Sequence, residues 1–182
     1  MATELAKLYA NALFELFLES DSDDNIHTQI NEYDTVFRNN HDLVQLLSAP
    51  LLTSDEKQSI ISKIFDDNGL MFDYLRLICD KGRSEYFSEI TEIFNQKYNE
   101  YKNIADISVI TSKPLSGDLK TKLIKKLENK LNKTVILNEK TDPEIIDGII
   151  IEYNNKRLDS SVRAKLKNIK TAMTDADLQA KI

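Results

Sequence analysis

The segment 142–166 constrains the fold of this chain most, because its residues predict a turn, a β-hairpin and a capped helix in direct succession. Asp142-Pro143 is typical of a turn, and the apolar run Ile149 to Tyr153 predicts a largely buried strand. Asn154-Asn155 suits the positive φ angles of a two-residue hairpin turn, after which Lys156 to Leu158 returns as the partner strand. The segment therefore predicts a sheet in this half of the chain.

The ends of the hairpin carry two further local signals. Gly148, directly before the first strand, permits a tight backbone position. Asp159 to Ser161 offers several candidate N-caps for a helix that carries Val162, Leu166 and Ile169. A helix should therefore follow the hairpin without a long loop.

Charge divides the chain into two parts near Asn103. Residues 1–104 hold 9 Lys and Arg against 19 Asp and Glu, whereas residues 105–182 hold 15 against 11. The balances of −10 and +4 agree with the formal net charge of −6 for the 182 residues. Because the hydrophobic periodicity changes at the same place, we expect two domains, 1–104 and 105–182.

The first part has helical periodicity almost throughout. Apolar side chains at spacings of three and four, together with caps such as Thr53 and stops such as Gly82, predict a bundle of six helices. The expected helices cover residues 4–19, 24–39, 42–48, 54–66, 70–81 and 85–103.

The second part predicts a small α/β domain with a mixed sheet and two helices. Strands are expected at 105–111 and 134–139, in addition to the hairpin, with a helix at 116–131 between them. That helix should bury four leucines at intervals of four residues: Leu119, Leu123, Leu127 and Leu131. The chain as a whole is thus expected to be an α+β protein.

The same helix exposes a row of five lysines: Lys120, Lys122, Lys125, Lys126 and Lys130. A solvated face and a nucleic-acid contact both fit such a row. The strands lack the aromatic pairs that stack on bases, and the protein is acidic, with a pI near 5.0. We therefore expect no nucleic-acid partner.

The first helix is apolar over more of its circumference than a helix at the rim of a bundle needs. Its polar residues Glu4, Lys7, Asn11 and Glu15 fall within about 80° of the helical wheel, and its apolar residues cover about 240°. Two explanations remain open. Either its own bundle surrounds this helix, or one edge packs inside while the other receives a partner's helix. The helix 70–81 has a similar excess of apolar residues.

The motifs of common enzymes and metal sites do not occur in this sequence. It contains no phosphate-binding glycine loop, no paired metal motif and no nucleophile elbow. The single cysteine, Cys79, fits a buried apolar thiol, and His27 and His41 fit polar helix surfaces. We expect no catalytic residue, no metal and no cofactor.

No apolar run approaches the roughly 20 residues that a membrane-spanning helix needs. The first residues also lack the basic start and apolar core of a secretory signal, and they do not resemble an Arg-rich transit peptide. The expected location is the bacterial cytosol or a membrane-bound complex that faces it.

Five fragments, in order, resemble the delta subunit of F-type ATP synthases, the family of the oligomycin-sensitivity-conferring protein. They are Lys7 to Glu15, Leu46 to Pro50 with Lys57, Phe72 to Arg83, Val109 to Ser116, and the segment 142–166. Two positions depart from the family pattern: Asp147, where a second glycine is frequent, and Lys113, where a small residue is usual.

This resemblance implies a non-catalytic stator subunit in the peripheral stalk of a proton-translocating synthase. The first domain would bind the N-terminal helix of an alpha subunit, and the second the C-terminal end of the b subunits, so that the head does not turn with the central shaft. The subunit would be peripheral to the cytoplasmic face of the bacterial inner membrane.

In this family the first and fifth helices form the groove for the alpha-subunit helix. On matching positions the resemblance implies five groove residues: Tyr9, Ala12, Leu13, Leu77 and Ile78. Periodicity alone leaves open which face is groove and which is core. The alternative to this function is a stand-alone helical adaptor or an RNA-binding protein.

Overall fold

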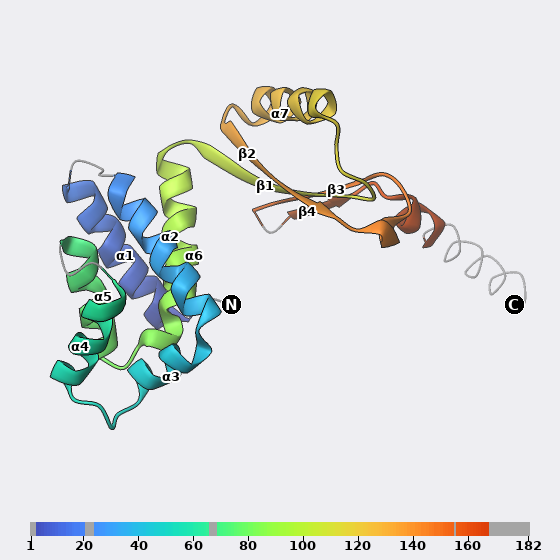
Figure 1. Cartoon of the computed structure of the whole chain (residues 1–182). Helices are drawn as coiled ribbons and strands as arrows, with labels where there is room; N and C mark the ends of the chain where they lie inside the picture. The colour runs from blue at the N-terminus through green and yellow to red at the C-terminus, as the bar shows by residue number, and fades with distance from the viewer. Residues whose placement is uncertain (1–2, 21–23, 66–68, 155, 168–182) are drawn as a thin grey trace, which may run out of the picture. The chain divides into compact units, whose positions relative to one another are not determined.

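The computed structural model describes residues 3–20, 24–65, 69–154 and 156–167 of the chain. It divides into two compact units, Met1–Tyr98 and Asn99–Ile182, the first helical and the second built around a sheet (Figure 1). The predicted α+β class is confirmed. The units separate within the last helix of the first part, a few residues before the sequence-based boundary at 104.

Six α-helices occur in the described residues of the first part, and all begin and end within two residues of their predicted bounds. They are α1 (Glu4–Glu19), α2 (Asp24–Asn39), α3 (His41–Ser48), α4 (Ser54–Ile64), α5 (Leu70–Asp80) and α6 (Phe87–Tyr101). A 3-10 turn, η1 (Ser84–Tyr86), replaces the predicted first turn of α6. The helix ends before Asn103 because that residue takes a positive φ of 56°.

Local caps fix the corner between α4, α5 and η1. At α4 the Thr53 side chain accepts a bond from the Glu56 N–H while the Glu56 carboxylate accepts one from the Thr53 N–H, which is the predicted capping box. At the end of α5, the N–H of Gly82 (φ +64°) donates to the Cys79 carbonyl, and the N–H of Arg83 donates to the Ile78 carbonyl. This pair of hydrogen bonds is a Schellman motif. Its residue with positive φ is usually a glycine, as it is here.

The core of the first unit contains large side chains from four helices. Leu13 and Phe17 of α1, Ile30 and Phe37 of α2, Leu75 and Ile78 of α5, and Phe87, Ile90 and Phe94 of α6 are buried. Phe17 and Phe94 make an edge-to-face contact with ring centroids 6.0 Å apart. His27 is half-buried on α2 and stacks on Tyr98 with ring centroids 3.8 Å apart.

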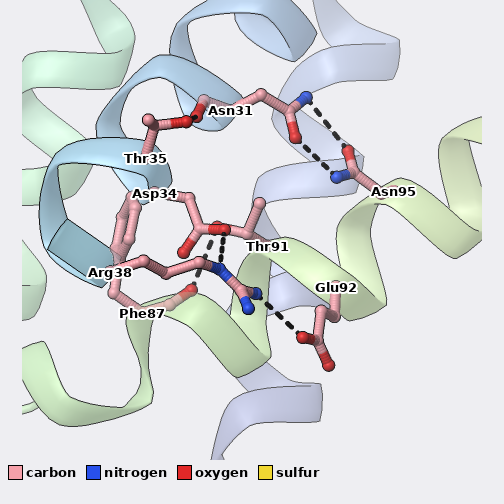
Figure 2. Close-up of polar contacts among 8 residues, drawn as sticks. All are labelled: Asn31, Asp34, Thr35, Arg38, Phe87, Thr91, Glu92 and Asn95. Carbon is pink, nitrogen blue, oxygen red and sulfur yellow. Dashed lines mark hydrogen bonds and ion pairs between the residues drawn. The ribbon is translucent and has the colours of Figure 1, made fainter. Parts of the chain in front are cut away.

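A polar seam joins α2 to α6 (Figure 2). Asn31 and Asn95 exchange two side-chain bonds of 2.7 and 3.3 Å, so that each amide serves the other as donor and acceptor. One turn along, Arg38 bridges the Asp34 and Glu92 carboxylates at 2.6 and 2.8 Å. These directional contacts add to the apolar packing of α6 on α2, because each hydrogen bond requires its donor and acceptor to be aligned.

The second unit contains a four-stranded mixed sheet in the order β2-β1-β3-β4. The strands are β1 (Ile104–Thr111), β2 (Thr134–Thr141), β3 (Ile149–Tyr153) and β4 (Lys156–Asp159). The strand β1 pairs in parallel with β2 and antiparallel with β3, and the hairpin β3-β4 is antiparallel. The turn residue Asn154 has the predicted positive φ of 47°. Asn155 lies outside the described residues.

The helix α7 (Gly117–Leu131) covers one face of this sheet (Figure 1). Ala105, Ile107, Val109 and Val135 form a buried cluster, against which Leu123, Leu127 and Leu131 pack as predicted. Leu119 is 55% exposed, so its predicted burial is wrong. Steps of four residues drift by about 40° each around a helix, and Ile124 fills the inner position instead.

A close backbone approach fixes the start of the hairpin. A Cβ at Gly148 (φ +101°) would lie 2.7 Å from the Ser160 carbonyl oxygen, so no other residue fits without a shift. Residues 162–167 are helical, and the Ser161 hydroxyl caps them by accepting from the Ala164 N–H at 3.1 Å. Ile169, the third apolar residue expected on this helix, lies outside the described residues.

The preceding turn begins as predicted and then departs from ordinary geometry. The Asp142 carboxylate accepts from the Glu144 N–H and opens the 3-10 turn η2 (Pro143–Ile145). Ile146 then takes a φ of 70° while the Asp147 N–H donates to the Ile145 carbonyl at 2.9 Å. This is the rare γ-turn with positive φ, which is strained for a β-branched residue.

Candidate functional site

The side of α1 that faces away from the bundle carries apolar side chains with substantial exposure. Leu8 is 65% exposed, Ala12 is exposed, and Tyr9 is partly exposed between them and the core. Leu5 and Leu16, also partly exposed, extend the same row at helical spacing. We call Leu5, Leu8, Tyr9, Ala12 and Leu16 the outer α1 face. Its exposure excludes the explanation that α1 is surrounded by its own bundle.

The helix α5 lies beside α1. The Tyr74 hydroxyl donates a hydrogen bond of 2.9 Å to the Tyr9 backbone carbonyl. Burial raises the pKa of Tyr74 well above its usual range, and the nearby Tyr9 raises it further, so the hydroxyl stays a donor. On the outside of α5, Leu77 is 47% exposed. Tyr9, Ala12 and Leu77 of the expected groove thus all have accessible surface on two adjacent helices.

Leu13 and Ile78, the other two expected groove residues, belong to the core. Both have an exposed fraction of 0%, so neither presents surface to a partner, and the expectation that they line the groove walls is corrected. Leu13 lies on the inner side of α1 together with Ala6, Ala10 and Phe17. Ile78 lies inward on α5, next to the outward Leu77. Both residues can support the walls from inside only.

Sequence reasoning missed Leu8, the most exposed large apolar side chain of α1. A signal for it was present, because Leu5, Leu8, Ala12 and Leu16 follow one another at steps of three and four residues. The inner residues Ala6, Ala10, Leu13 and Phe17 follow the same steps. Two equivalent stripes on one helix leave the choice of the buried one to tertiary packing.

Two buried polar groups, the Cys79 thiol and the Lys57 ammonium, have defined partners at the corner between α4, α5 and η1. Cys79 is a buried thiol, as predicted. Burial raises the pKa of this thiol to about 11, and the Ser84 hydroxyl donates a hydrogen bond to its sulfur. The buried Lys57 ammonium donates 3.1 Å to the Cys79 carbonyl, where the negative end of α5 favours a cation. The lysine of the fourth helix is therefore a cap for the fifth.

Neither a metal centre nor a membrane span emerges from the described residues. In residues 3–20, 24–65, 69–154 and 156–167, no three His, Cys, Asp or Glu side chains gather to hold a metal. Across those same ranges, no helix combines the length and the apolar character needed to cross a bilayer. The most distinctive surface of the first unit is thus an apolar helix face beside a neighbouring helix.

Comparison with known proteins decides the family. Residues 5–173 match the family described as ATP synthase delta (OSCP) subunit. This chain belongs to the ATP synthase delta (OSCP) subunit family. It is 31% identical to the ATP synthase subunit delta of Carboxydothermus hydrogenoformans, over 93% of this chain and 96% of that protein. It is 30% identical to the ATP synthase subunit delta of Lactobacillus johnsonii, over 94% of this chain and 96% of that protein.

A solved structure shares the fold of this delta-family chain. A chain of the Toxoplasma gondii mitochondrial ATP synthase hexamer aligns with a TM-score of 0.73 at 16% identity, over 94% of this chain and 98% of that one. Family membership gives the function: the protein is a peripheral-stalk subunit of an ATP synthase, part of a membrane-bound complex and without an active site of its own. A stand-alone adaptor or an RNA-binding protein no longer needs to be considered.

Proposed function

We propose that this delta subunit ties the catalytic head to the peripheral stalk through two separate contacts. Residues 1–104 act as one six-helix bundle that binds the N-terminal helix of an alpha subunit. Residues 105–182 bind the C-terminal region of the b subunits. The subunit works at the cytoplasmic face of the bacterial plasma membrane and keeps the head from rotating with the central shaft.

The observation that carries the first contact is the exposed apolar surface on two adjacent helices. Leu8 and Leu77 are 65% and 47% exposed, and the Tyr74 bond to Tyr9 holds α5 against α1 beside them. An amphipathic helix that lays its apolar side on such a surface removes area from water on both partners. The small Ala12 allows close approach of that helix between the larger side chains.

The two contacts together explain why the chain has two units. A tether bound at one end only would dissociate each time that contact opened. With both partners fixed in one complex, the second contact becomes intramolecular and forms at a high effective concentration. Moderate affinity at each contact therefore suffices for a lasting connection under torque.

The first contact is tested by titrating a peptide of the alpha-subunit N-terminal helix against the full chain. Leu8→Lys and Leu77→Lys should each weaken binding about tenfold or more, because each places a charge in a contact that excludes water. Leu46→Lys is the matched control: Leu46 has nearly the same exposure as Leu77, 44%, but lies on α3.

Circular dichroism shows whether each variant keeps its helices. Folded Leu8→Lys and Leu77→Lys proteins that bind the peptide as tightly as the parent would refute the proposed contact. Equal weakening by Leu46→Lys would refute its location on α1 and α5.

A further inference from the structure

The two edges of the sheet in the second unit differ in how well they are protected. The strand β4, at one edge, has four residues, of which Lys156, Arg157 and Asp159 are charged. Short length and charge are the usual protection of a sheet edge against further pairing. The strand β2, at the other edge, has eight residues. It is therefore the edge that is long enough to pair with a further strand.

Along β2, backbone groups that bond β1 alternate with groups that point away from the sheet. The N–H groups of Thr134 and Asp142 donate to the carbonyls of Asn103 and Thr111 at 3.1 and 2.8 Å. Because every second residue of a strand bonds the same neighbour, the even-numbered residues of β2 face β1. The residues that direct their N–H and C=O groups outward are Val135, Leu137, Glu139 and Thr141.

Only the start of this outward row is closed by the chain itself. The Glu128 carboxylate of α7 accepts a long bond of 3.4 Å from the Val135 N–H. Among the residues that the structure describes, the N–H groups of Leu137, Glu139 and Thr141 have no acceptor. Free donors and acceptors in a row along an edge are the template on which an added strand forms its main-chain bonds.

The side chains beside this row define the chemistry of a matching segment. Leu137 and its β1 partner Ile107 pack on the α7 side, so the even-numbered residues of β2 lie on the opposite face. There Ile136 is 47% exposed, and Lys140 makes no ion pair within the described part of the chain. On an added strand, the residues beside Ile136 and Lys140 are four positions apart in either direction. An apolar side chain and a carboxylate at those two positions complement the edge.

We propose that β2 accepts an extended segment of another protein as a fifth strand, with an apolar side chain beside Ile136 and a carboxylate beside Lys140. Main-chain bonds supply the affinity, and the two side chains select the segment. A second copy of this chain does not fit that description. Between Thr134 and Thr141 the same face of β2 carries no acidic residue, so two paired copies would leave Lys140 without a carboxylate. The pairing requires neither the alpha-subunit contact nor the b-subunit contact.

The probe is a capped peptide, Thr-Val-Thr-Asn-Thr-Asp-Thr, whose valine and aspartate are four positions apart. Amide hydrogen exchange in the full chain, followed by NMR, reports on each N–H group of β2. Without peptide, Leu137, Glu139 and Thr141 should exchange faster than the even-numbered residues between them. Peptide at about 1 mM should slow these three at least about twofold, because a site of millimolar affinity is then half occupied.

Variants separate the main-chain bonds from the charge. Lys140→Glu should weaken the aspartate peptide about threefold to tenfold and favour a peptide with lysine at that position. Lys126→Glu is the matched control, because Lys126 is exposed on α7, and it should bind as the parent does. Thr141→Pro removes one outward N–H and should weaken binding, whereas Thr141→Val keeps that donor and should not. Circular dichroism checks the fold of each variant.

Three results would overturn the inference, and none of them touches the stator contacts. Unchanged exchange at all three N–H groups at about 1 mM peptide would show that the edge does not accept a strand. Slow exchange of these groups in the free chain would show that the chain itself closes the edge. Protection that appears without peptide and rises with protein concentration would identify a second copy as the occupant. Equal binding of aspartate and asparagine peptides would refute the carboxylate beside Lys140.

Discussion

The outer α1 face and the sheet face opposite α7 differ in the kind of surface that each unit leaves open. The first presents Leu8 and Ala12, which have no hydrogen-bonding group to satisfy. The second presents polar side chains that are paired across strands, Asn138 with Asp106 and Arg157 with Glu152. A contact at the first gains from area removed from water, and a contact at the second from charge. One subunit can thus hold two partners without either one competing for the other's surface.

The largest expected effect separates the two stripes of α1. Leu13→Ala should lower the free energy of unfolding of the first unit by about 2–5 kcal/mol, because it leaves a cavity in a fully buried site. Leu8→Ala should change it by less than about 0.5 kcal/mol, because Leu8 is mostly exposed. Urea unfolding measures both, and hydrogen exchange assigns the loss to the bundle.

The same pair of variants also tests the correction to the groove. A Leu13→Ala protein that is as stable as the parent would return Leu13 to the surface, where the resemblance placed it. A large loss of stability in Leu8→Ala would mean that the outer α1 face is covered by the chain itself.

The next effect concerns the junction that closes the second unit. Gly148→Ala should destabilise that unit by about 1–3 kcal/mol, because the new Cβ meets the Ser160 carbonyl and the positive φ is strained. Gly117→Ala is the control, since a Cβ there meets nothing within 4 Å. Hydrogen exchange in β3 and β4 should report the difference, and a neutral Gly148→Ala would contradict the close approach.

Salt tests the comparison of the two open surfaces directly. Between about 0.05 M and about 0.5 M salt, a soluble fragment of the b subunit that contains its C-terminal region should lose about fivefold to tenfold in affinity for the full chain, whereas the alpha-subunit peptide should change by less than about twofold. Screening weakens a contact between charges and leaves apolar burial nearly unaffected. Isothermal titration at both concentrations measures the two slopes. Equal slopes would break the distinction.

The sequence predicts those parts of the fold that short-range chemistry determines. The Thr53 capping box, the stop at Gly82 and the hairpin at Asn154 each depend on residues within a few positions, and each is present in the structure. The Pro143 turn belongs with them. Its continuation through the γ-turn at Ile146 was not predictable, because no propensity favours a β-branched residue there.

Prediction of the site failed where the answer depends on packing. The helical wheel of α1 shows that its apolar surface is too wide, but it cannot show which part faces inward. Leu13 and Leu8 belong to stripes of similar spacing, and tertiary packing buries Leu13 and leaves Leu8 exposed. The polar face of the sheet depends on strand pairing that brings Asn138 of β2 to Asp106 of β1, which no local pattern encodes.

The smallest expected effect concerns the anchor that holds the start of α1 on α6. The side-chain hydroxyl and the backbone N–H of Thr3 both donate to the Glu89 carboxylate, and these bonds lower the pKa of Glu89 below its usual 4.5. A lowered pKa in the folded state means that the contribution to stability is present above pH 4.5 and is lost as the pH falls through the folded value. Glu89→Gln should therefore flatten the acid side of the stability curve below about pH 4.5 while leaving the shape near pH 7 unchanged.

The control Glu85→Gln changes a carboxyl that makes no bond among the described residues, and it should keep the parent's curve. Urea unfolding from pH 7 down to about pH 3 measures all three proteins, and an acid limb as steep in Glu89→Gln as in the parent would show that the Thr3–Glu89 contact does not hold the start of α1 on α6.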